Sequence, residues 1–131
     1  MAMLLGVGAD ILRVERIRSC LDSEPFMKAT FTEAEVDLAR SRSDPGSYYA
    51  KLFAGKEAVF KCFGMPADSL KSWLDIEIVD GEHGQPEVNI RGPLATVADS
   101  RGVRRVALSL SYDTEYAMAV AALTRGVDND S

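Results

Sequence analysis

The prevailing spacing of apolar residues changes near Trp73, and that change limits the folds the chain can adopt. Upstream, apolar residues recur every three or four positions, which predicts amphipathic helices. Downstream, they alternate with polar residues, which predicts half-buried strands. The pattern therefore predicts an α+β fold, with helices of the first half packed on an antiparallel sheet formed mainly by the second half.

The predicted elements follow from this pattern and from the turn residues between them. Upstream we expect a strand at 4–11 and helices at 13–21, 33–40 and 47–63. Downstream we expect strands at 73–79, 87–91, 105–112 and 116–123, and a short helix at 93–99. Thr32 and Glu35 have the spacing of a capping box, and Gly64 suits a left-handed position after a helix. We expect one domain over 1–124 and a disordered tail at 125–131.

Length, charge and cysteine content narrow the class of protein. A chain of 131 residues is the size of one domain. Its net charge of −5 disfavours nucleic-acid binding, so an anionic partner requires a local basic patch. The N-terminus lacks a basic leader, and no apolar run approaches the roughly 20 residues that span a bilayer. Cys20 and Cys62 lie outside metal-ligand spacing, so we expect free thiols and a reducing, cytoplasmic location. From the charge and the lack of a long apolar run, we expect no nucleic-acid or membrane partner.

The residues of this chain do not match two familiar types of site. The pair Gly6 and Gly8 follows a strand, but a dinucleotide-binding fingerprint would need a third glycine where Ile11 stands. His83 is the one histidine of the chain. Neither a Ser-His-Asp triad nor a multi-histidine zinc site has plausible partners for it. It lies in a predicted hairpin tip, so we interpret it as a solvated loop residue.

The remaining acid–base candidates are Asp10, Glu57 and Lys61. Taken alone, Asp10 could cap the helix that follows it, and Glu57 with Lys61 could be an exposed pair one helical turn apart. Taken together, a strand-end aspartate and a helix glutamate can hold Mg2+, which typically uses one or two carboxylates plus substrate phosphates and water. A nearby lysine would balance phosphate charge.

Two linked motifs carry a resemblance to a known family. They are Val7-Gly8-Ala9-Asp10 and, later, Phe53-Ala54-Gly55-Lys56-Glu57-Ala58-Val59-Phe60-Lys61. At this separation they resemble the phosphopantetheinyl transferases, and especially the small holo-acyl-carrier-protein synthase group. The order of the predicted elements also fits, so the resemblance covers nearly the whole chain.

The resemblance implies an activity and a catalytic site. Such enzymes transfer 4'-phosphopantetheine from coenzyme A to a serine of apo acyl carrier protein and release adenosine 3',5'-bisphosphate. By position, Asp10 and Glu57 would bind Mg2+ and Lys61 would grip the pyrophosphate, which makes these three the expected catalytic residues. Glu57 could also accept the serine proton.

The resemblance also implies binding surfaces. Lys61, Lys56, Gly84, Pro86 and Ser111 would contact coenzyme A, although Gly84 and Pro86 could equally form an ordinary hairpin turn. Arg13 and Arg16 would receive the acidic carrier protein, and the alternative for them is a solvated charged face. Family members of this size are usually homotrimers that share active sites. The small residues Ala117, Ala119, Ala121 and Ala122 could pack against another subunit or belong to a core strand.

Two positions depart from the family pattern. Many members have arginine where this chain has Leu52 and histidine where it has Tyr112, and both positions are linked to the phosphates of coenzyme A. Lys51 precedes Leu52, but a helix turns about 100° per residue, so we expect that Lys51 cannot replace that side chain. These departures leave a second reading open, that of a non-catalytic module that binds coenzyme A or a carrier protein.

Overall fold

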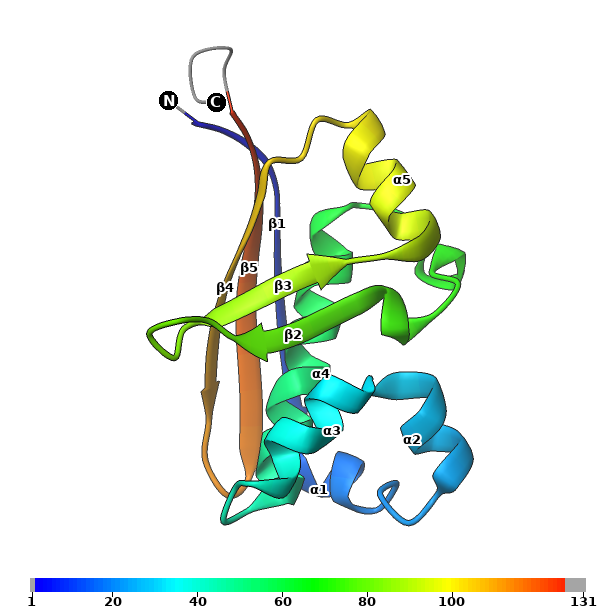
Figure 1. Ribbon diagram of the computed structural model, residues 1–131, viewed down its shortest axis with the longest axis vertical. Coiled ribbons are helices and arrows are strands. Elements are labelled where there is room, and N and C mark those ends of the chain that lie inside the picture. The colour runs from blue at the N-terminus through cyan, green and yellow to red at the C-terminus, as the bar shows by residue number, and fades with distance from the viewer. Residues whose placement is uncertain (1, 127–131) are drawn as a thin grey trace.

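The computed structural model describes residues 2–126, and it has the expected α+β class (Figure 1). Its first half contains β1 (Ala2–Arg13), α1 (Val14–Arg18), α2 (Glu24–Thr30), α3 (Glu33–Arg40) and α4 (Pro45–Cys62). Two short 3₁₀ turns follow, η1 (Ala67–Ser69) and η2 (Trp73–Asp75). The second half contains β2 (Ile76–Asp80), β3 (Pro86–Ile90), α5 (Gly92–Ser100), β4 (Arg105–Tyr112) and β5 (Tyr116–Gly126).

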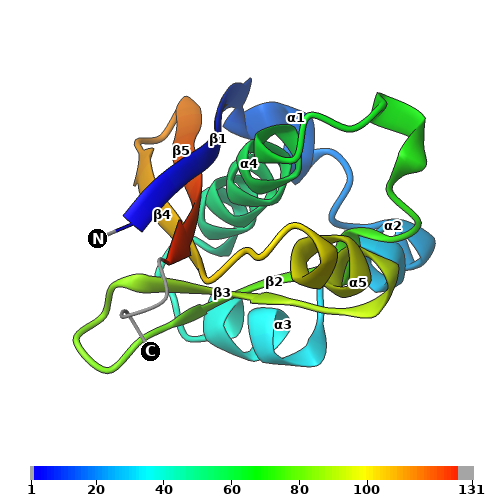
Figure 2. The same cartoon turned by 90° about the horizontal axis from the view of Figure 1, so that it is seen from above.

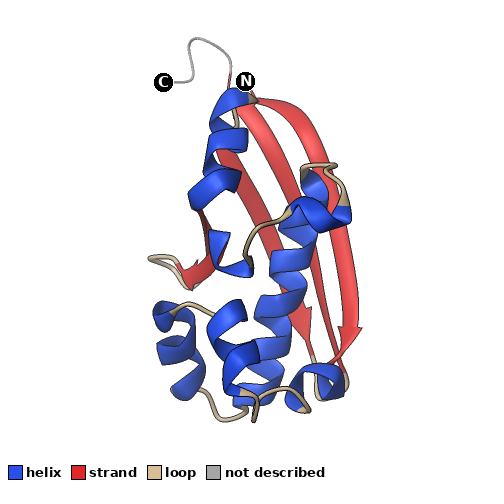
Figure 3. Ribbon diagram, turned by 90° about the vertical axis from the view of Figure 1, so that its right-hand side faces the viewer, coloured by secondary structure: helices blue, strands red, loops and turns tan. Residues whose placement is uncertain are grey.

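The strands form two separate antiparallel sheets. The larger has the order β1-β5-β4, so the first strand pairs with the last, and the smaller is the hairpin β2-β3. Figure 3 shows the three long strands side by side, with helices gathered on one face. The prediction of a single sheet did not anticipate this division. The hairpin contacts β4 and α4 through its side chains, so Ile78 of β2 and Leu108 and Leu110 of β4 meet α4 together at Gly55 without joining one sheet.

Helix α4 forms the centre of the core. Seen from above, the β1-β5-β4 sheet covers one side of it, and the β2-β3 hairpin covers an adjacent side next to β4 (Figure 2). Almost all of its side chains are buried, including Tyr48, Leu52 and Val59. A helix that is apolar on most of its circumference can be stable only when other elements cover it on several sides. None of the helices within residues 2–126 is long and apolar enough to cross a membrane.

The strongest local signals were predicted well. Helix α3 has the expected bounds, and Thr32 and Glu35 form both hydrogen bonds of the capping box. Gly64 follows α4 with φ of +63°, a left-handed conformation that glycine adopts without strain. Strand β4 also has the expected bounds.

Other boundaries differ from the predictions. β1 continues to Arg13, so α1 is one short turn rather than a helix over 13–21. Helix α2 was missed because it has too few apolar residues to show a period, although Ser23 caps it. The segment 73–75 is a 3₁₀ turn that precedes its strand, with Ser72 as its cap. β5 extends to Gly126, so the expected tail cannot begin at 125, and 127–131 lie outside the described residues.

Candidate active site

Asp10 is brought to α4 by two glycines on the same face of β1. A methyl group added at Gly6 would lie 2.1 Å from the carbonyl oxygen of Cys62, and one added at Gly8 would lie 2.2 Å from that of Ala58. Any larger residue would therefore push the strand away from the helix. The glycines that fail as a dinucleotide fingerprint serve instead to place Asp10 against the α4 backbone.

Asp10 lies within β1 rather than at its end, and its carboxylate faces Lys61 of α4. The Lys61 Nζ donates hydrogen bonds to Asp10 Oδ1 and to the Ala9 carbonyl oxygen, each at 3.1 Å. The Asp10 side chain is 9% exposed and that of Lys61 is 53% exposed. The lysine can therefore reach solvent or a ligand, while the aspartate is held in place.

Glu57 completes the cluster, one helical turn before Lys61. Partial burial and the neighbouring Asp10 carboxylate, with which Glu57 hydrogen-bonds when protonated, raise the pKa of Glu57 to about 6. The positive charges of Arg16 and Lys61 lower this pKa and so limit the shift. Two acidic groups held this close favour an additional cation between them.

The simpler explanations for these residues are wrong in their details. Asp10 is not a helix cap, because Arg13 occupies the N-cap position of α1 and Asp10 is paired within β1. Within residues 2–126, Lys61 forms its ion pair with Asp10 rather than with Glu57. The predicted triad of Asp10, Glu57 and Lys61 is therefore brought together in space.

The two carboxylates fit a magnesium ion whose remaining ligands are substrate phosphates and water. Asp10 Oδ2 is buried and accepts no hydrogen bond within the described part of the chain, which leaves this oxygen available as a ligand for a cation. No group of three or more His, Cys, Asp or Glu side chains that could hold a metal occurs in residues 2–126. Two carboxylates suffice for Mg2+ when phosphates and water supply the other ligands.

A partly apolar pocket of about 310 Å³ opens beside this cluster. Its walls are Glu57, Phe60, Lys61, Met65, Ala67 and Trp73. Trp73 packs against Phe53 and Phe60, with ring centroids 5.3 and 6.3 Å away. Sequence reasoning did not connect Trp73 with the site, because the residue belongs to a turn whose position depends on tertiary contacts.

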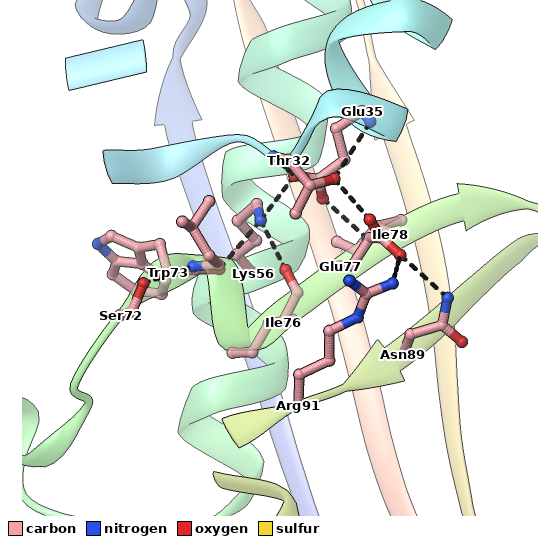
Figure 4. Close-up of polar contacts among 11 residues, drawn as sticks. Thr32, Glu35, Lys56, Ser72, Trp73, Ile76, Glu77, Ile78, Asn89 and Arg91 are labelled. Atoms are coloured by element: carbon pink, nitrogen blue, oxygen red, sulfur yellow. Dashed lines mark hydrogen bonds and ion pairs between the residues drawn. The ribbon is translucent and has the colours of Figure 1, made fainter. Parts of the chain in front are cut away.

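Lys56 does not belong to this pocket, which corrects its expected role in coenzyme A binding. Its side chain is 0% exposed and forms an ion pair of 2.9 Å with Glu35. Figure 4 shows its Nζ directed toward Glu35 and toward the backbone carbonyls of Trp73 and Ile76. Burial lowers the pKa of Lys56, an effect that Glu35 opposes. A ligand cannot reach an ammonium that is enclosed on all sides.

Gly84 and Pro86 line a different pocket, of about 170 Å³, beside the tip of the β2-β3 hairpin. Lys51, Leu52 and Tyr112 also line it. The Lys51 Nζ lies 4.2 Å from the ring centroid of Tyr48 and 5.3 Å from that of Tyr112. Lys51 therefore reaches the pocket that Leu52 and Tyr112 also line, which the helical angle between Lys51 and Leu52 did not lead us to expect.

Ser111 lies apart from both pockets. It lines a shallow hollow with Ile11, Tyr112 and Met118 on the outer face of the β1-β5-β4 sheet. The pocket with Gly84 has no lining residue in common with the pocket that contains Glu57. Within one chain, the expected coenzyme A contacts are thus divided between separate surfaces.

Of the two expected carrier-protein residues, Arg13 ends β1 and Arg16 lies in the last turn of α1. The Arg13 guanidinium carbon lies 5.3 Å from the ring centroid of Tyr116, and that of Arg16 lies 5.9 Å from that of Phe53. Phe53 lies one turn of α4 before Glu57, so Arg16 stands close to the acidic cluster, and its charge lowers the pKa of Glu57. The basic end of α1 therefore adjoins the candidate site.

Comparison with known proteins agrees with this arrangement. Residues 6–121 match the model of the 4'-phosphopantetheinyl transferase superfamily. The chain is 38% identical over 125 residues to a holo-[acyl-carrier-protein] synthase of Caldanaerobacter subterraneus subsp. tengcongensis, covering 95% of this chain and 98% of that protein. It is 41% identical over 120 residues to the corresponding protein of Chlamydia trachomatis serovar D, covering 90% and 98%.

Solved structures give the same result. The acyl carrier protein synthase of Plasmodium yoelii with ADP bound has a TM-score of 0.84 and 29% identity, covering 96% of this chain and 98% of that chain. A Bacillus anthracis holo-(acyl-carrier-protein) synthase in complex with CoA (3',5'-ADP) has a TM-score of 0.77 and 30% identity, covering 95% and 99%. The chain belongs to the 4'-phosphopantetheinyl transferase superfamily, in the holo-acyl-carrier-protein synthase group.

Proposed function

We propose that this chain transfers 4'-phosphopantetheine from coenzyme A to a serine of apo acyl carrier protein and releases adenosine 3',5'-bisphosphate. The observation that carries the proposal is the convergence of Asp10 on Glu57 and Lys61, from β1 and α4. This arrangement offers acidic oxygens and a mobile ammonium at one edge of a pocket. Those groups suit phosphoryl transfer, in which positioning and charge neutralisation do most of the work.

We propose that Asp10 and Glu57 hold Mg2+. The buried, unpaired Asp10 Oδ2 and the mutual approach of the two carboxyl groups support this assignment. When bound, the ion would neutralise charge on the pyrophosphate of coenzyme A. Lys61 would then turn from Asp10 toward the phosphates, because more than half of its side chain is exposed.

In the proposed reaction the serine oxygen of the carrier protein attacks the phosphorus that bears the pantetheine arm. The bond from that phosphorus to the bridging oxygen breaks, and adenosine 3',5'-bisphosphate leaves with the bond's electrons. Glu57 accepts the serine proton, directly or through a water. In the metal-free site the pKa of Glu57 is raised to about 6, so the group is ionised at neutral pH, and a bound cation would favour the ionised form further.

We propose that the pocket with Gly84 and Pro86 receives the nucleotide end of coenzyme A. Lys51 supplies a cation there, in place of the arginine and histidine that many relatives carry at the positions of Leu52 and Tyr112. Its ammonium is held between two tyrosine rings, and burial lowers its pKa. A nearby anion would favour its charged form.

A homotrimer is the assembly we propose, because one chain leaves the two pockets apart. The outer face of the large sheet is rich in exposed apolar side chains, including Val7, Ile11, Met118 and Val120. Of the four alanines for which a subunit interface and a core strand were both open, Ala117, Ala119 and Ala121 are core residues, and Ala122 is only partly buried. A neighbouring copy on the outer face would cover its apolar surface and bring a second pocket near Glu57.

We propose that Arg13 and Arg16 attract the acidic carrier protein. Their place beside the cluster would deliver the acceptor serine toward Glu57, although the chain as a whole carries a net charge of −5. We also propose that the reaction takes place in the cytoplasm. Free thiols at Cys20 and Cys62 are consistent with a reducing compartment.

A mass-shift assay tests the function. Incubation with apo acyl carrier protein, coenzyme A and Mg2+ should add one phosphopantetheine arm to the carrier protein. Omission of Mg2+ with a chelator present should stop the gain. Binding of coenzyme A or of carrier protein without any gain in mass would identify a non-catalytic binding module instead.

A further inference from the structure

A fully buried ion pair stands directly behind the candidate site. Lys56 Nζ and Glu35 Oε1 are 2.9 Å apart, and both side chains are 0% exposed (Figure 4). Removing two charges from water costs about as much free energy as their attraction returns, so such a pair is a poor source of net stability. Its value lies in what its directional contacts hold in place.

All three donors of the Lys56 ammonium are used. Besides Glu35, it donates to the carbonyl oxygens of Trp73 at 3.0 Å and Ile76 at 2.6 Å. These two carbonyls bracket the turn η2. A lysine ammonium has three donors and no acceptor, so this set of contacts is complete. The ammonium therefore fixes both ends of the turn relative to α4.

Glu35 anchors the same region from α3. Its Oε1 also accepts from the Thr32 backbone N at 2.8 Å, within the capping box, and its Oε2 accepts from the Ile78 backbone N at 2.8 Å. One carboxylate thus joins the start of α3, the ammonium of α4 and strand β2. The turn η2 cannot move relative to α4 unless buried hydrogen bonds break.

The turn held in this way carries a wall of the candidate pocket. Trp73 lines the same pocket as Glu57 and Lys61 and packs on Phe60. Lys56 itself is the residue before Glu57 on α4. The ion pair therefore connects the helix that bears Glu57 to the turn that carries Trp73, another residue of the pocket wall.

We propose that Lys56 and Glu35 are positioning residues that hold Trp73 against the Glu57 pocket and thereby set how coenzyme A is seated for transfer. They act without touching the substrate. The inference rests on the proposed function, since it assigns this pocket to coenzyme A. A displacement of about 1 Å at such a wall can lower a rate on the order of 100-fold.

The decisive variant removes both charges at nearly constant volume, as the double substitution Lys56→Met with Glu35→Gln. Lys56→Met alone leaves a buried carboxylate without its partner, so its melting temperature should fall strongly. The double variant should recover much of that loss. It should nevertheless show a KM for coenzyme A raised on the order of tenfold or more, because no group bonds the carbonyls of Trp73 and Ile76.

Intrinsic fluorescence gives a readout that needs no substrate. Trp73 is the single tryptophan of the chain, so its emission reports the pocket wall alone. We expect a red shift in the double variant at a temperature where it is folded. The matched control is Asp44→Asn, which breaks the 2.8 Å pair with Arg18, away from Trp73. It should lower the melting temperature without changing the emission or the KM for coenzyme A.

Ser72→Ala provides a second, milder test. The Ser72 Oγ accepts from the Leu74 backbone N at 3.1 Å and caps η2 without contact with the buried pair. Its removal should raise the KM several-fold and shift the emission in the same direction, and it decides the matter if the double variant does not fold. Unchanged KM and emission in the folded variants, while the wild type transfers normally, would overturn the inference. A wild type that transfers nothing would instead refute the proposed function.

Discussion

The Lys61 Nζ lies 3.1 Å from Oδ1 of Asp10, a residue 51 positions earlier in the chain. This contact joins the first strand to the central helix and places a mobile cation beside a fixed anion. A metal ion that binds Asp10 would compete with the ammonium and free it for the substrate's phosphates. The predictions below follow from this arrangement and from the surfaces around it.

Glu57→Gln should reduce transfer by roughly 100-fold to 10,000-fold, the range typical of a lost general base. The melting temperature should not fall, because no ion pair within residues 2–126 includes Glu57. Rates from the mass-shift assay and a thermal melt measure the two effects. Glu24→Gln is the control, since it removes an exposed carboxylate that pairs with Lys28 one helical turn later. Normal turnover in Glu57→Gln would exclude it from the mechanism.

Gly8→Ala should separate β1 from α4 and so impair the site through Asp10. The added methyl group would meet the Ala58 carbonyl oxygen at 2.2 Å, and such overpacking typically costs about 1–3 kcal/mol. Transfer per folded molecule should also fall. Gly64→Ala introduces backbone strain with no crowding, so it should destabilise the protein while folded molecules retain their rate. Full activity of folded Gly8→Ala would show that Asp10 needs no such close approach.

The pH dependence of stability should show the raised pKa of Glu57. A carboxyl group with a raised pKa stabilises the fold below its unfolded pKa of about 4.5, and this contribution is lost as pH rises through about 6. The metal-free wild type should therefore lose melting temperature relative to Glu57→Gln between pH 4.5 and pH 7. Mg2+ should raise the wild-type melting temperature more at pH 7 than at pH 5, since it binds the ionised form. Equal effects at both pH values would argue against this metal site.

Charge reversal on α1 should weaken carrier-protein recognition. Arg13→Glu and Arg16→Glu should each raise the KM for apo carrier protein several-fold at low salt, and less at high salt. Arg16→Glu should in addition shift the acid limb of the rate profile to higher pH, because Arg16 lowers the pKa of Glu57. If both variants affected coenzyme A and carrier protein equally, this face would not be the docking surface.

Val120→Glu should disrupt the proposed homotrimer. Val120 is 50% exposed on the outer face of the β1-β5-β4 sheet, where a buried charge would be costly. Light scattering should give the mass of three chains for the wild type and of one chain for the variant. Thr96→Glu places the same charge on the exposed side of α5 and should leave the trimer intact. A monomeric wild type would contradict the assembly.

Local signals accounted for the elements that the sequence placed well. The capping box of Thr32 and Glu35, the left-handed Gly64 and the alternation of 105–112 all depend on neighbours within a few residues. Helix α2 and the turn η2 depend on packing from distant segments, so local periodicity did not reveal them. The division into two sheets was missed for the same reason.

The sequence by itself determined the family and singled out Asp10, Glu57 and Lys61 as candidates for the site, because two linked motifs contain them. Only the tertiary structure decided which lysine of α4 faces the site. Lys56 and Lys61 stand five positions apart on a helix that turns about 100° per residue, so they point to different sides. Glu35 and the η2 carbonyls enclose the Lys56 ammonium, whereas the Lys61 ammonium beside Asp10 stays exposed at the pocket. The two differ because burial depends on which remote segments pack against each side of the helix.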